Sequence, residues 1–392
     1  MALVVDNRAT VQGPGIHALI VGVSQYLSLP DHDDPPREES WFLTRLTSPA
    51  LSAFKIFEFV QQSPLRLPIK TIRLLLSPSP VELGVKPQLA AAGATRANRA
   101  GFEQFALDWR NDANTDPDDM TIFYFSGHGM QRGPEDGVLL LEDFLAPGPP
   151  LAKCFEIGDL RNGMAPTNTF GKIAMTQFYF IDACLAREET QRKFLNPQVP
   201  EVFGVELSGV DRRAVPTMFS TVDGAIALGR NGKPSHFAEA LALALQRGAD
   251  ESVDLNGSIV WPVTPITIKT AIDLYYKKNK LGDVKVGGVI GAPVIRYLSD
   301  PPDVDISVQI QPGSLGNQCG IGLFDESGVV TQSCAPTPNP QFETTVKAGI
   351  YRVQLDSALL KSTPYKSSLK YLTQKVPWPW THNLVQLLKP PA

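Results

Sequence analysis

The 392-residue sequence predicts an α/β protein in which a mostly parallel sheet is flanked by helices and followed by a small antiparallel β domain. Short apolar runs without in/out alternation recur along the first 300 residues, which is typical of parallel strands covered on both faces. Helical segments separate these runs, as in a doubly wound sheet. Beyond residue 300 apolar and polar residues alternate between Gly, Pro and Ser turns, a pattern typical of antiparallel strands.

Five apolar runs are the predicted strands of the sheet: "IHALIVGV" (16–23), "KTIRLLL" (70–76), "MTIFYF" (120–125), "QFYFID" (177–182) and "PTMFS" (216–220). Four segments are predicted as helices: 48–62, 95–112, 235–248 and 264–280. Their ends carry capping residues. Thr95 and Ser235 stand at N-cap positions, Gly248 stands at a stop, and Thr264 precedes a proline at the first helical position.

A linker-like break, "SDPPDVD" (299–305), marks the predicted domain boundary. The sequence predicts a first domain over 1–300 and a small sandwich-like accessory domain over 301–392. Strands of the second domain are predicted within 304–310, 319–330, 342–357 and 382–388. The aromatic, proline-rich segment 376–382 either packs onto this domain or contacts a partner.

Composition excludes several classes of function. The net charge of −4 gives no basic field for nucleic acid. No apolar run reaches the roughly 18 residues of a membrane span, and the start lacks the pattern of a secretory signal. Four widely spaced cysteines predict neither a disulfide framework nor a paired-cysteine zinc site. We therefore expect a cytoplasmic protein that contacts neither nucleic acid nor membrane and needs no cofactor.

Two predicted strands end in residues that carry chemistry. The third ends in "SGHG", which puts His128 at its tip, and the fourth ends in "IDACLA", which puts Cys184 at its tip. Chemistry collects at the carboxyl ends of strands in open α/β sheets. The 56 positions between these residues suffice for one right-handed crossover, so we expect the two tips to be neighbours.

A cysteine beside a histidine suits nucleophilic catalysis. The imidazole takes the thiol proton, the thiolate attacks a carbonyl, and the N–H groups of Gly129 and Cys184 bind the oxyanion that forms. The glycines beside His128 leave room for a peptide backbone. Taken singly, the cysteine reads as core packing and the histidine as a turn residue. A zinc site is a further alternative, but no other Cys or His stands at ligand spacing, so no metal is predicted.

The "SGHG" motif followed by strand–"DAC" (182–184) resembles the caspase and metacaspase cysteine peptidases, in which the histidine lies about 50 residues upstream of the cysteine. Segments 17–30 and 219–245 resemble the first strand with its loop and the later strand, substrate loop and helix of that fold. The resemblance covers residues 14–300. It implies that His128 is the general base and acid, that Cys184 is the nucleophile, and that the amides of Gly129 and Cys184 form the oxyanion hole.

Asp182, two residues before the cysteine, resembles the metacaspase type, which cleaves after Arg or Lys; caspases carry Gln there and bind an aspartate. A carboxylate pairs well with a guanidinium. A cap for the adjacent loop is the alternative role for Asp182. Ser52 stands where metacaspases carry a second pocket Asp, so the acidic loop "PDHDDPP" (30–36) is a candidate substitute unless it is merely solvated. Its candidate residues are Asp31, Asp33 and Asp34. The family's calcium-binding carboxylates cannot be matched here, so calcium dependence is not carried over.

The sequence therefore predicts an endopeptidase that acts on proteins or peptides. The loop 185–215 is a predicted site of self-cleavage because it is rich in basic residues: Arg187, Arg192, Lys193, Arg212 and Arg213. Its stretch "NPQVPEVFG" (196–204) is expected to lack structure. The C-terminal β domain is expected to dock an activating protein, and the resemblance suggests an effector of bacterial defence or cell death. The alternatives are a catalytically inactive scaffold and a peptide ligase that uses the same thioester.

Overall fold

The computed structural model describes residues 3–92, 95–133, 136–149, 151–186, 199–204, 211–220, 229–281, 285–287, 292–311, 320–335, 341–356, 371–376 and 381–387. The chain divides into two compact units. The first comprises residues 1–244 and 264–296, and the second comprises residues 245–263 and 297–392. A segment just before residue 264, within the predicted first domain, thus joins the second unit.

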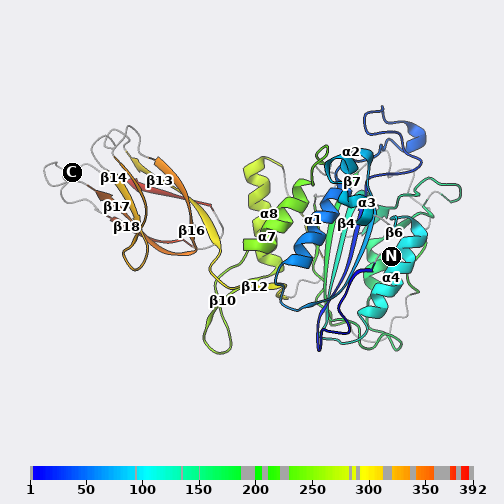
Figure 1. Cartoon of the computed structure of the whole chain (residues 1–392), viewed down its shortest axis with the longest axis horizontal. Coiled ribbons are helices and arrows are strands. Elements are labelled where there is room, and N and C mark those ends of the chain that lie inside the picture. The colour runs from blue at the N-terminus through cyan, green and yellow to red at the C-terminus, as the bar shows by residue number, and fades with distance from the viewer. Residues whose placement is uncertain are drawn as a thin grey trace. The chain divides into compact units, whose positions relative to one another are not determined.

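The first unit is built on a mixed sheet whose main path runs β1-β3-β2-β4-β7-β8-β11 (Figure 1). All five predicted strands are present, and they pair in parallel. The edge strands β1 and β11 are antiparallel to their neighbours. A hairpin of β5 and β6 extends from the end of β4. The bounds are Leu3–Asp6 (β1), Ile16–Val23 (β2), Ile69–Ser77 (β3), Met120–Gly133 (β4), Asp136–Leu140 (β5), Cys154–Glu156 (β6), Thr176–Ala186 (β7), Thr217–Phe219 (β8) and Lys285–Gly287 (β11).

The strand order contains a reversal that marks the place for a site. After β2 the chain adds β3 on one side, and then crosses over to add β4 on the other. Loops that leave the carboxyl ends of β2 and β4 therefore diverge, and ligands of open α/β sheets bind at such a switch point. The loop after β2 and the extended end of β4 border this place.

Helices cover both faces of the sheet, with α1, α7 and α8 on one side and α4 on the other (Figure 1). Close packing of α1 requires a glycine in β2, because a Cβ on Gly22 would lie 2.7 Å from the Ala53 Cβ. On the other side, the Trp109 indole donates a hydrogen bond of 3.0 Å to the carbonyl of His17. The bounds are Glu38–Ser40 (η1, a 3₁₀ turn), Pro49–Gln62 (α1), Pro80–Val85 (α2), Gln88–Ala92 (α3), Arg99–Asp112 (α4), Ile157–Gly163 (α5), His236–Arg247 (α7) and Pro265–Asn279 (α8).

Three of the predicted helix ends are confirmed and one is wrong. Helix α7 ends at Arg247, directly before Gly248. The Ser235 hydroxyl accepts the Ala238 N–H at 3.0 Å, and Thr264 caps α8 ahead of a proline. Helix α4 begins after Asn98 instead of Thr95, because the Asn98 side chain accepts the N–H three residues on at 2.9 Å. The asparagine carbonyl thereby satisfies an otherwise unpaired amide of the first turn.

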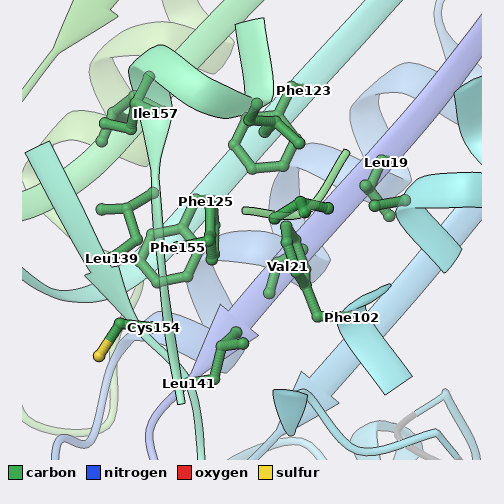
Figure 2. Packing of buried hydrophobic residues seen from close by; sticks show 14 of the residues in the cluster. Leu19, Val21, Phe102, Phe123, Phe125, Leu139, Leu141, Cys154, Phe155 and Ile157 are labelled. Carbon is green, nitrogen blue, oxygen red and sulfur yellow. The ribbon is translucent and has the colours of Figure 1, made fainter. Parts of the chain in front are cut away.

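The core on the α4 side is aromatic. Phe123 and Phe125 of β4 point toward Phe155 of β6, which stacks on Phe102 of α4 at 4.0 Å between ring centroids (Figure 2). Cys154 lies fully buried at the margin of this cluster. Because the opposite face is covered as well, the strands show continuous burial, which explains their unbroken apolar sequences.

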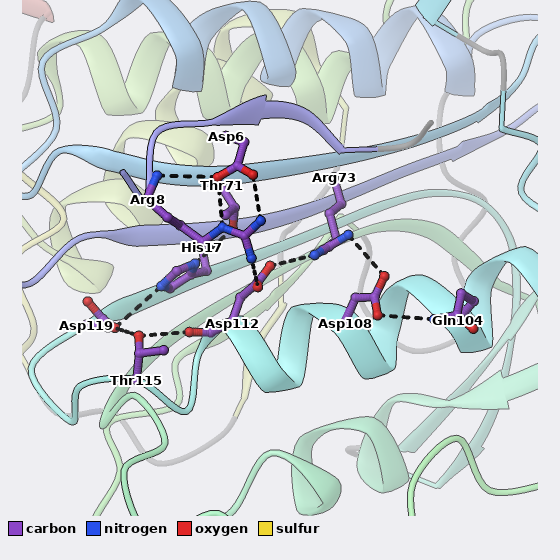
Figure 3. A network of polar contacts seen from close by, with 10 residues as sticks. All are labelled: Asp6, Arg8, His17, Thr71, Arg73, Gln104, Asp108, Asp112, Thr115 and Asp119. Carbon is purple, nitrogen blue, oxygen red and sulfur yellow. Dashed lines mark hydrogen bonds and ion pairs between the residues drawn. The ribbon is translucent and has the colours of Figure 1, made fainter. Parts of the chain in front are cut away.

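A polar network closes the amino-terminal end of the sheet (Figure 3). Asp119 accepts hydrogen bonds from the Lys70 ammonium at 2.8 Å, the Thr115 hydroxyl at 2.8 Å and the Gly15 amide at 2.7 Å, and it lies 3.4 Å from His17. Burial raises the pKa of Asp119, but these partners more than offset it and bring the pKa to about 2. His17 is therefore part of the scaffold, far along β2 from the switch point.

The second unit consists of small sheets. One sheet follows the order β16-β13-β19, another follows β15-β14-β17-β18, and the hairpin β9–β10 pairs with β12. β9 with β10, β13 with β16, β14 with β15 and β17, and β17 with β18 pair antiparallel, as predicted. β19 differs from the prediction because it pairs in parallel with β13. Residues 377–380 of the aromatic segment lie outside the described residues. The bounds are Ser252–Val253 (β9), Ile259–Val263 (β10), Arg296–Leu298 (β12), Asp303–Gln311 (β13), Gly320–Phe324 (β14), Val330–Cys334 (β15), Gln341–Lys347 (β16), Gly349–Asp356 (β17), Tyr371–Val376 (β18) and Thr381–Leu387 (β19).

Two features are absent from the described part of the chain. No helix within it has the length and apolarity needed to cross a membrane. No group of three His, Cys, Asp or Glu side chains within it is arranged to hold a metal ion.

Candidate active site

The register of β4 against β7 brings the two predicted site residues side by side. Ser126 pairs with Asp182 and His128 pairs with Cys184 along this parallel ladder. Neighbouring strands lie about 4.8 Å apart, so the backbones of His128 and Cys184 are in direct contact distance. The side chain of Cys184 lies outside the described residues.

His128 is held from two directions. Its ring Nε2 lies 2.7 Å from the carbonyl oxygen of Thr44, in the loop after β2, and its backbone N–H donates to the Tyr26 hydroxyl at 2.7 Å. The Tyr26 ring also packs on the imidazole, with 4.9 Å between centroids. A carbonyl can only accept, so Nε2 carries the proton and Nδ1 has a free lone pair.

The imidazole is neutral at physiological pH. The side chain is only 8% exposed, and burial lowers the pKa of His128 to about 4 against a small opposing effect of the Thr44 carbonyl. A neutral ring with a fixed Nε2–H is suited to accept a proton at Nδ1.

The glycine before His128 makes room for Tyr26. A Cβ on Gly127 would lie 2.8 Å from the Tyr26 hydroxyl, which binds the backbone of His128. Its predicted part in making room for a substrate peptide stays a prediction. Gly129, the glycine after the histidine, stands in register with Leu139 of β5 and Leu185 of β7. Its part in an oxyanion hole stays a prediction.

Asp182 is the centre of a cluster of hydroxyl groups. Its Oδ2 accepts hydrogen bonds from Tyr124 at 2.9 Å, Ser126 at 3.0 Å and Ser235 at 2.5 Å. The residue is 4% exposed, and burial raises its pKa while the three hydroxyl groups lower it in part. All three donors converge on one oxygen, so within the described residues Oδ1 has no hydrogen-bond donor.

Ser52 links this cluster to α1. Its hydroxyl accepts the Ser235 N–H at 2.8 Å and donates to the Ser48 carbonyl at 2.8 Å. The position that the resemblance assigns to a second pocket carboxylate thus holds a hydroxyl that is already paired. Helix α7 begins at the Ser235 cap, so the cap, the helix start and Asp182 are connected.

The acidic loop gives its three candidate residues different surroundings. Asp31 forms an ion pair of 2.6 Å with Arg45. Asp33 is 88% exposed at its side chain and lies 3.1 Å from His32. Asp34 is exposed, and its backbone N–H closes a turn onto the Asp31 carbonyl.

Part of the loop after Cys184 is firmly attached to the rest of the first unit. The Arg99 guanidinium donates to the carbonyls of Pro200 and Glu201, and Phe203 packs so closely on Gly163 that a Cβ there would lie 2.2 Å from the ring. Residues 199–204 form no helix or strand, in line with the expectation for 196–204, but these contacts fix their path. Phe203 supplies the apolar anchor, and α4 supplies the donors.

The basic residues of this loop differ in accessibility. Arg213 is 5% exposed and donates to the Arg161 carbonyl and to Gln177, both at 2.9 Å. Arg212 is exposed. The other three predicted cleavage positions, Arg187, Arg192 and Lys193, lie outside the described residues.

Among the residues that the structure describes, the remaining cysteines and histidines do not form a second site of this kind. Burial raises the pKa of the Cys154 thiol far above its ordinary value, so this thiol stays protonated in the core. Cys334 lies in the second unit, and Cys319 is outside the described residues. His236 is hydrogen-bonded at 3.2 Å to the Tyr275 hydroxyl.

A model of the caspase domain family, Peptidase C14, matches residues 90–259 of the chain, a range that contains both His128 and Cys184. This part of the chain is similar to a caspase domain. A caspase domain suggests a cysteine peptidase and therefore a hydrolase. The match ends before most of the second unit, and it begins after β2, which carries the loop that binds His128.

Individual relatives are distant. An uncharacterized protein of Sinorhizobium fredii, y4kE, is 27% identical over 235 residues, which are 56% of this chain and 63% of that protein, so the chain covers less than two thirds of its length. Among solved structures, a protein of Geobacter sulfurreducens has a TM-score of 0.40 and 14% identity over 71% of this chain and 95% of its own. Caspase-1 of Spodoptera frugiperda has a TM-score of 0.40 and 12% identity over 71% of this chain and 88% of its own.

Sequence reasoning missed the residues that hold the caspase-like site together. Thr44 acts through its backbone, which leaves no mark on the side-chain pattern. Tyr26 did carry a signal, since a tyrosine two or three residues past a buried strand lies at the switch point. The hydroxyl groups of Tyr124 and Ser126 were visible as polar interruptions in a strand that is otherwise apolar.

Proposed function

We propose that the chain is a cysteine endopeptidase with a His128/Cys184 dyad that cleaves after Arg or Lys. The observation that carries the proposal is the pairing of these two residues in the β4–β7 register, with Nε2 of His128 already bound by the Thr44 carbonyl. Residues paired directly across parallel strands project to the same face of a sheet. We therefore expect the Cys184 sulfur to share the His128 side of the sheet.

The proposed reaction uses the imidazole twice. Nδ1 of His128 takes the Cys184 thiol proton, and the thiolate attacks the scissile carbonyl carbon. The oxyanion is stabilised by the backbone N–H groups of Gly129 and Cys184. The imidazolium returns its proton to the leaving amine, and water, activated by the same ring, then hydrolyses the thioester and frees the thiol. The Thr44 carbonyl steadies the ring in its charged form by accepting a hydrogen bond from the Nε2–H group throughout.

The preference for basic residues rests on Asp182. Three hydroxyl groups occupy Oδ2 and stabilise the ionised form, and Oδ1 is left for a guanidinium or ammonium group. Ser52 adds no charge, so we expect a single pocket carboxylate. Asp33 and Asp34, at the exposed rim, are the remaining candidates for contacts with a basic side chain. Asp31 is engaged with Arg45 and is a weaker candidate.

Self-cleavage in 185–215 is part of the proposal, with a narrower range of positions. Arg213 is buried and bound on several sides, so it is a poor substrate, whereas Arg212 and the three basic residues before 199 remain candidates. Cleavage before 199 would create a C-terminal fragment. The segment near its new amino terminus would stay anchored through Phe203 and the hydrogen bonds from Arg99. The second unit is proposed to dock an activating protein, with the enzyme acting in the cytoplasm as an effector of bacterial defence or cell death.

A panel of fluorogenic peptides with Arg, Lys, Asp or Asn at the cleaved position tests the proposal. We expect cleavage after Arg and Lys, lost in His128→Ala and in Cys184→Ala. The matched control is Cys334→Ser, which removes a thiol from the second unit and should retain full activity. Cleavage after Asp alone would overturn the role of Asp182.

If no peptide of the panel is cleaved, the protein is either a latent enzyme or an inactive scaffold. Labelling with an arginyl-ketone inhibitor, followed by mass spectrometry, distinguishes the two. A latent enzyme labels at Cys184 after activation and does not label in the Cys184→Ala protein. Absence of label under every condition would favour the inactive scaffold, and transfer of the acyl group to an added amine would favour ligation over hydrolysis.

A further inference from the structure

We propose that Tyr26, Arg45 and Asp31 form a clamp that sets the His128 imidazole against the Thr44 carbonyl, and that they are positioning residues for the reaction. This inference rests on the proposed function. None of the three is expected to touch the reacting atoms. They act by fixing the two partners of one hydrogen bond, which come from separate parts of the chain.

Tyr26 contacts His128 directly and is linked to the Thr44 segment through Arg45. Its hydroxyl accepts the His128 N–H at 2.7 Å and donates to the Leu140 carbonyl at 3.3 Å, while its ring packs on the imidazole. Its own carbonyl accepts the Arg45 Nε at 3.0 Å, and Arg45 is the neighbour of Thr44. Tyr26 is fully buried, so packing on all sides fixes the position of its ring.

Arg45 ties the far end of the loop to its beginning. Besides the Tyr26 carbonyl, the guanidinium binds Asp31 at 2.6 Å, and the Arg45 amide donates to the Pro30 carbonyl at 2.9 Å. The next amide, that of Leu46, donates to the Ser24 carbonyl at 2.9 Å. The peptide group that carries the Thr44 oxygen is therefore flanked by attachment points to the segment that follows β2.

The turn of the loop is constrained as well. Trp41 and Phe42 adopt positive φ angles of 55° and 58°, which non-glycine residues rarely populate. Such conformations persist where the surroundings enforce them. The Trp41 ring packs edge-on against Phe144 at 5.6 Å between centroids, and its amide donates to the Glu38 carbonyl. The loop thus has one defined path back to Thr44.

The consequence of the clamp is a single tautomer. While the Thr44 carbonyl faces Nε2, the proton stays there and Nδ1 remains a base; if the carbonyl moves away, both tautomers become accessible and only one of them can accept the thiol proton. Small displacements of a catalytic group cost roughly 10- to 100-fold in rate. The clamp therefore affects the rate of the chemical step and leaves substrate binding in place.

The primary test is nitrogen NMR of the imidazoles in ¹⁵N-histidine-labelled full-length protein, which reports the tautomer without any need for activity. The chain has five histidines, and His128→Gln assigns the signal. We expect one Nε2-protonated tautomer in the wild type and a mixture in Tyr26→Phe and in Arg45→Ala. Arg45→Lys keeps the charge but lacks the planar guanidinium that binds two partners at once. Its fraction of Nε2-protonated His128 should lie between those of the wild type and Arg45→Ala.

Controls come from the same loop. Arg37 and Glu39 are exposed, and Arg37→Ala and Glu39→Gln should leave both the imidazole spectrum and peptide cleavage unchanged. Asp31→Asn breaks a surface ion pair, so its effect on kcat should be small, about 2- to 5-fold. Thermal unfolding of each variant identifies those that have lost the fold.

The outcomes separate the clamp from the proposed function. Mixed tautomers with a kcat about 10- to 100-fold lower and an unchanged KM support both. Mixed tautomers in a protein whose wild type cleaves no peptide support the clamp and overturn the peptidase. An unaltered His128 spectrum in folded Tyr26→Phe and Arg45→Ala overturns the clamp, as does a raised KM with normal kcat.

Discussion

Replacing Tyr124 by phenylalanine removes one hydroxyl group from the Asp182 cluster and leaves the buried ring in place. The hydroxyl donates to Asp182 Oδ2 at 2.9 Å, and both residues are buried. A hydrogen bond to a charged acceptor contributes about 1.5–3 kcal/mol, against about 1 kcal/mol for a neutral one. We therefore expect Tyr124→Phe to lower the free energy of unfolding by about 2 kcal/mol at neutral pH.

The matched control is Tyr179→Phe in the adjacent strand. Tyr179 is equally buried, but its hydroxyl donates to the neutral amide oxygen of Gln177 at 3.1 Å. We expect a loss of about 1 kcal/mol from this change, independent of pH. Chemical denaturation followed by fluorescence reports on both, because Trp109 is buried in the same unit.

The pH dependence distinguishes an ionised Asp182 from a neutral one. Burial raises the pKa of Asp182 in the folded state, so folding favours the protonated carboxyl group. The stability gained from this preference is fully present below the unfolded pKa and is lost as pH rises through the folded pKa. Removing a donor raises the folded pKa further, so the deficit of Tyr124→Phe should grow with rising pH. Equal losses for the two tyrosine variants at neutral pH, or a deficit that shrinks as pH rises, would refute an ionised pocket carboxylate.

Three more results are expected. Burial lowers the pKa of His128 to about 4, so the folded state favours the neutral ring. This stability is present above the unfolded pKa and is lost as pH falls toward about 4, by up to about 3 kcal/mol. Denaturation midpoints should fall with pH in this range in the wild type and not in His128→Gln. Asp119→Asn leaves the Lys70 ammonium without its buried partner and should cost about 3–5 kcal/mol in urea denaturation, so a loss below 1 kcal/mol would contradict the network. Gly163→Ala should cost about 1–3 kcal/mol, because the added methyl meets a ring at 2.2 Å, whereas Gly84→Ala in α2 has open space and should be neutral or up to about 1 kcal/mol stabilising. Equal melting temperatures for the two alanine variants would contradict this packing.

The sequence by itself determined the five parallel strands, the four long helices and the two candidate site residues. A strand that is covered on both faces is visible in the sequence as an apolar run, and a helix start is visible as a capping residue or a proline in the first turn. His128 and Cys184 were found because each interrupts the end of such a run. Their pairing followed from crossover geometry, since successive parallel strands are commonly neighbours.

Only the tertiary structure decided how the site is held. The Thr44 oxygen belongs to the backbone, and its contact with His128 joins positions 84 residues apart, so no local pattern encodes it. The hydroxyl groups around Asp182 come from β4 and from the start of α7, and the segment after Pro200 is anchored by α4. Hydrogen bonds between distant segments depend on where the chain brings each donor, and that placement results from the packing of the whole sheet rather than from the identity of any one residue.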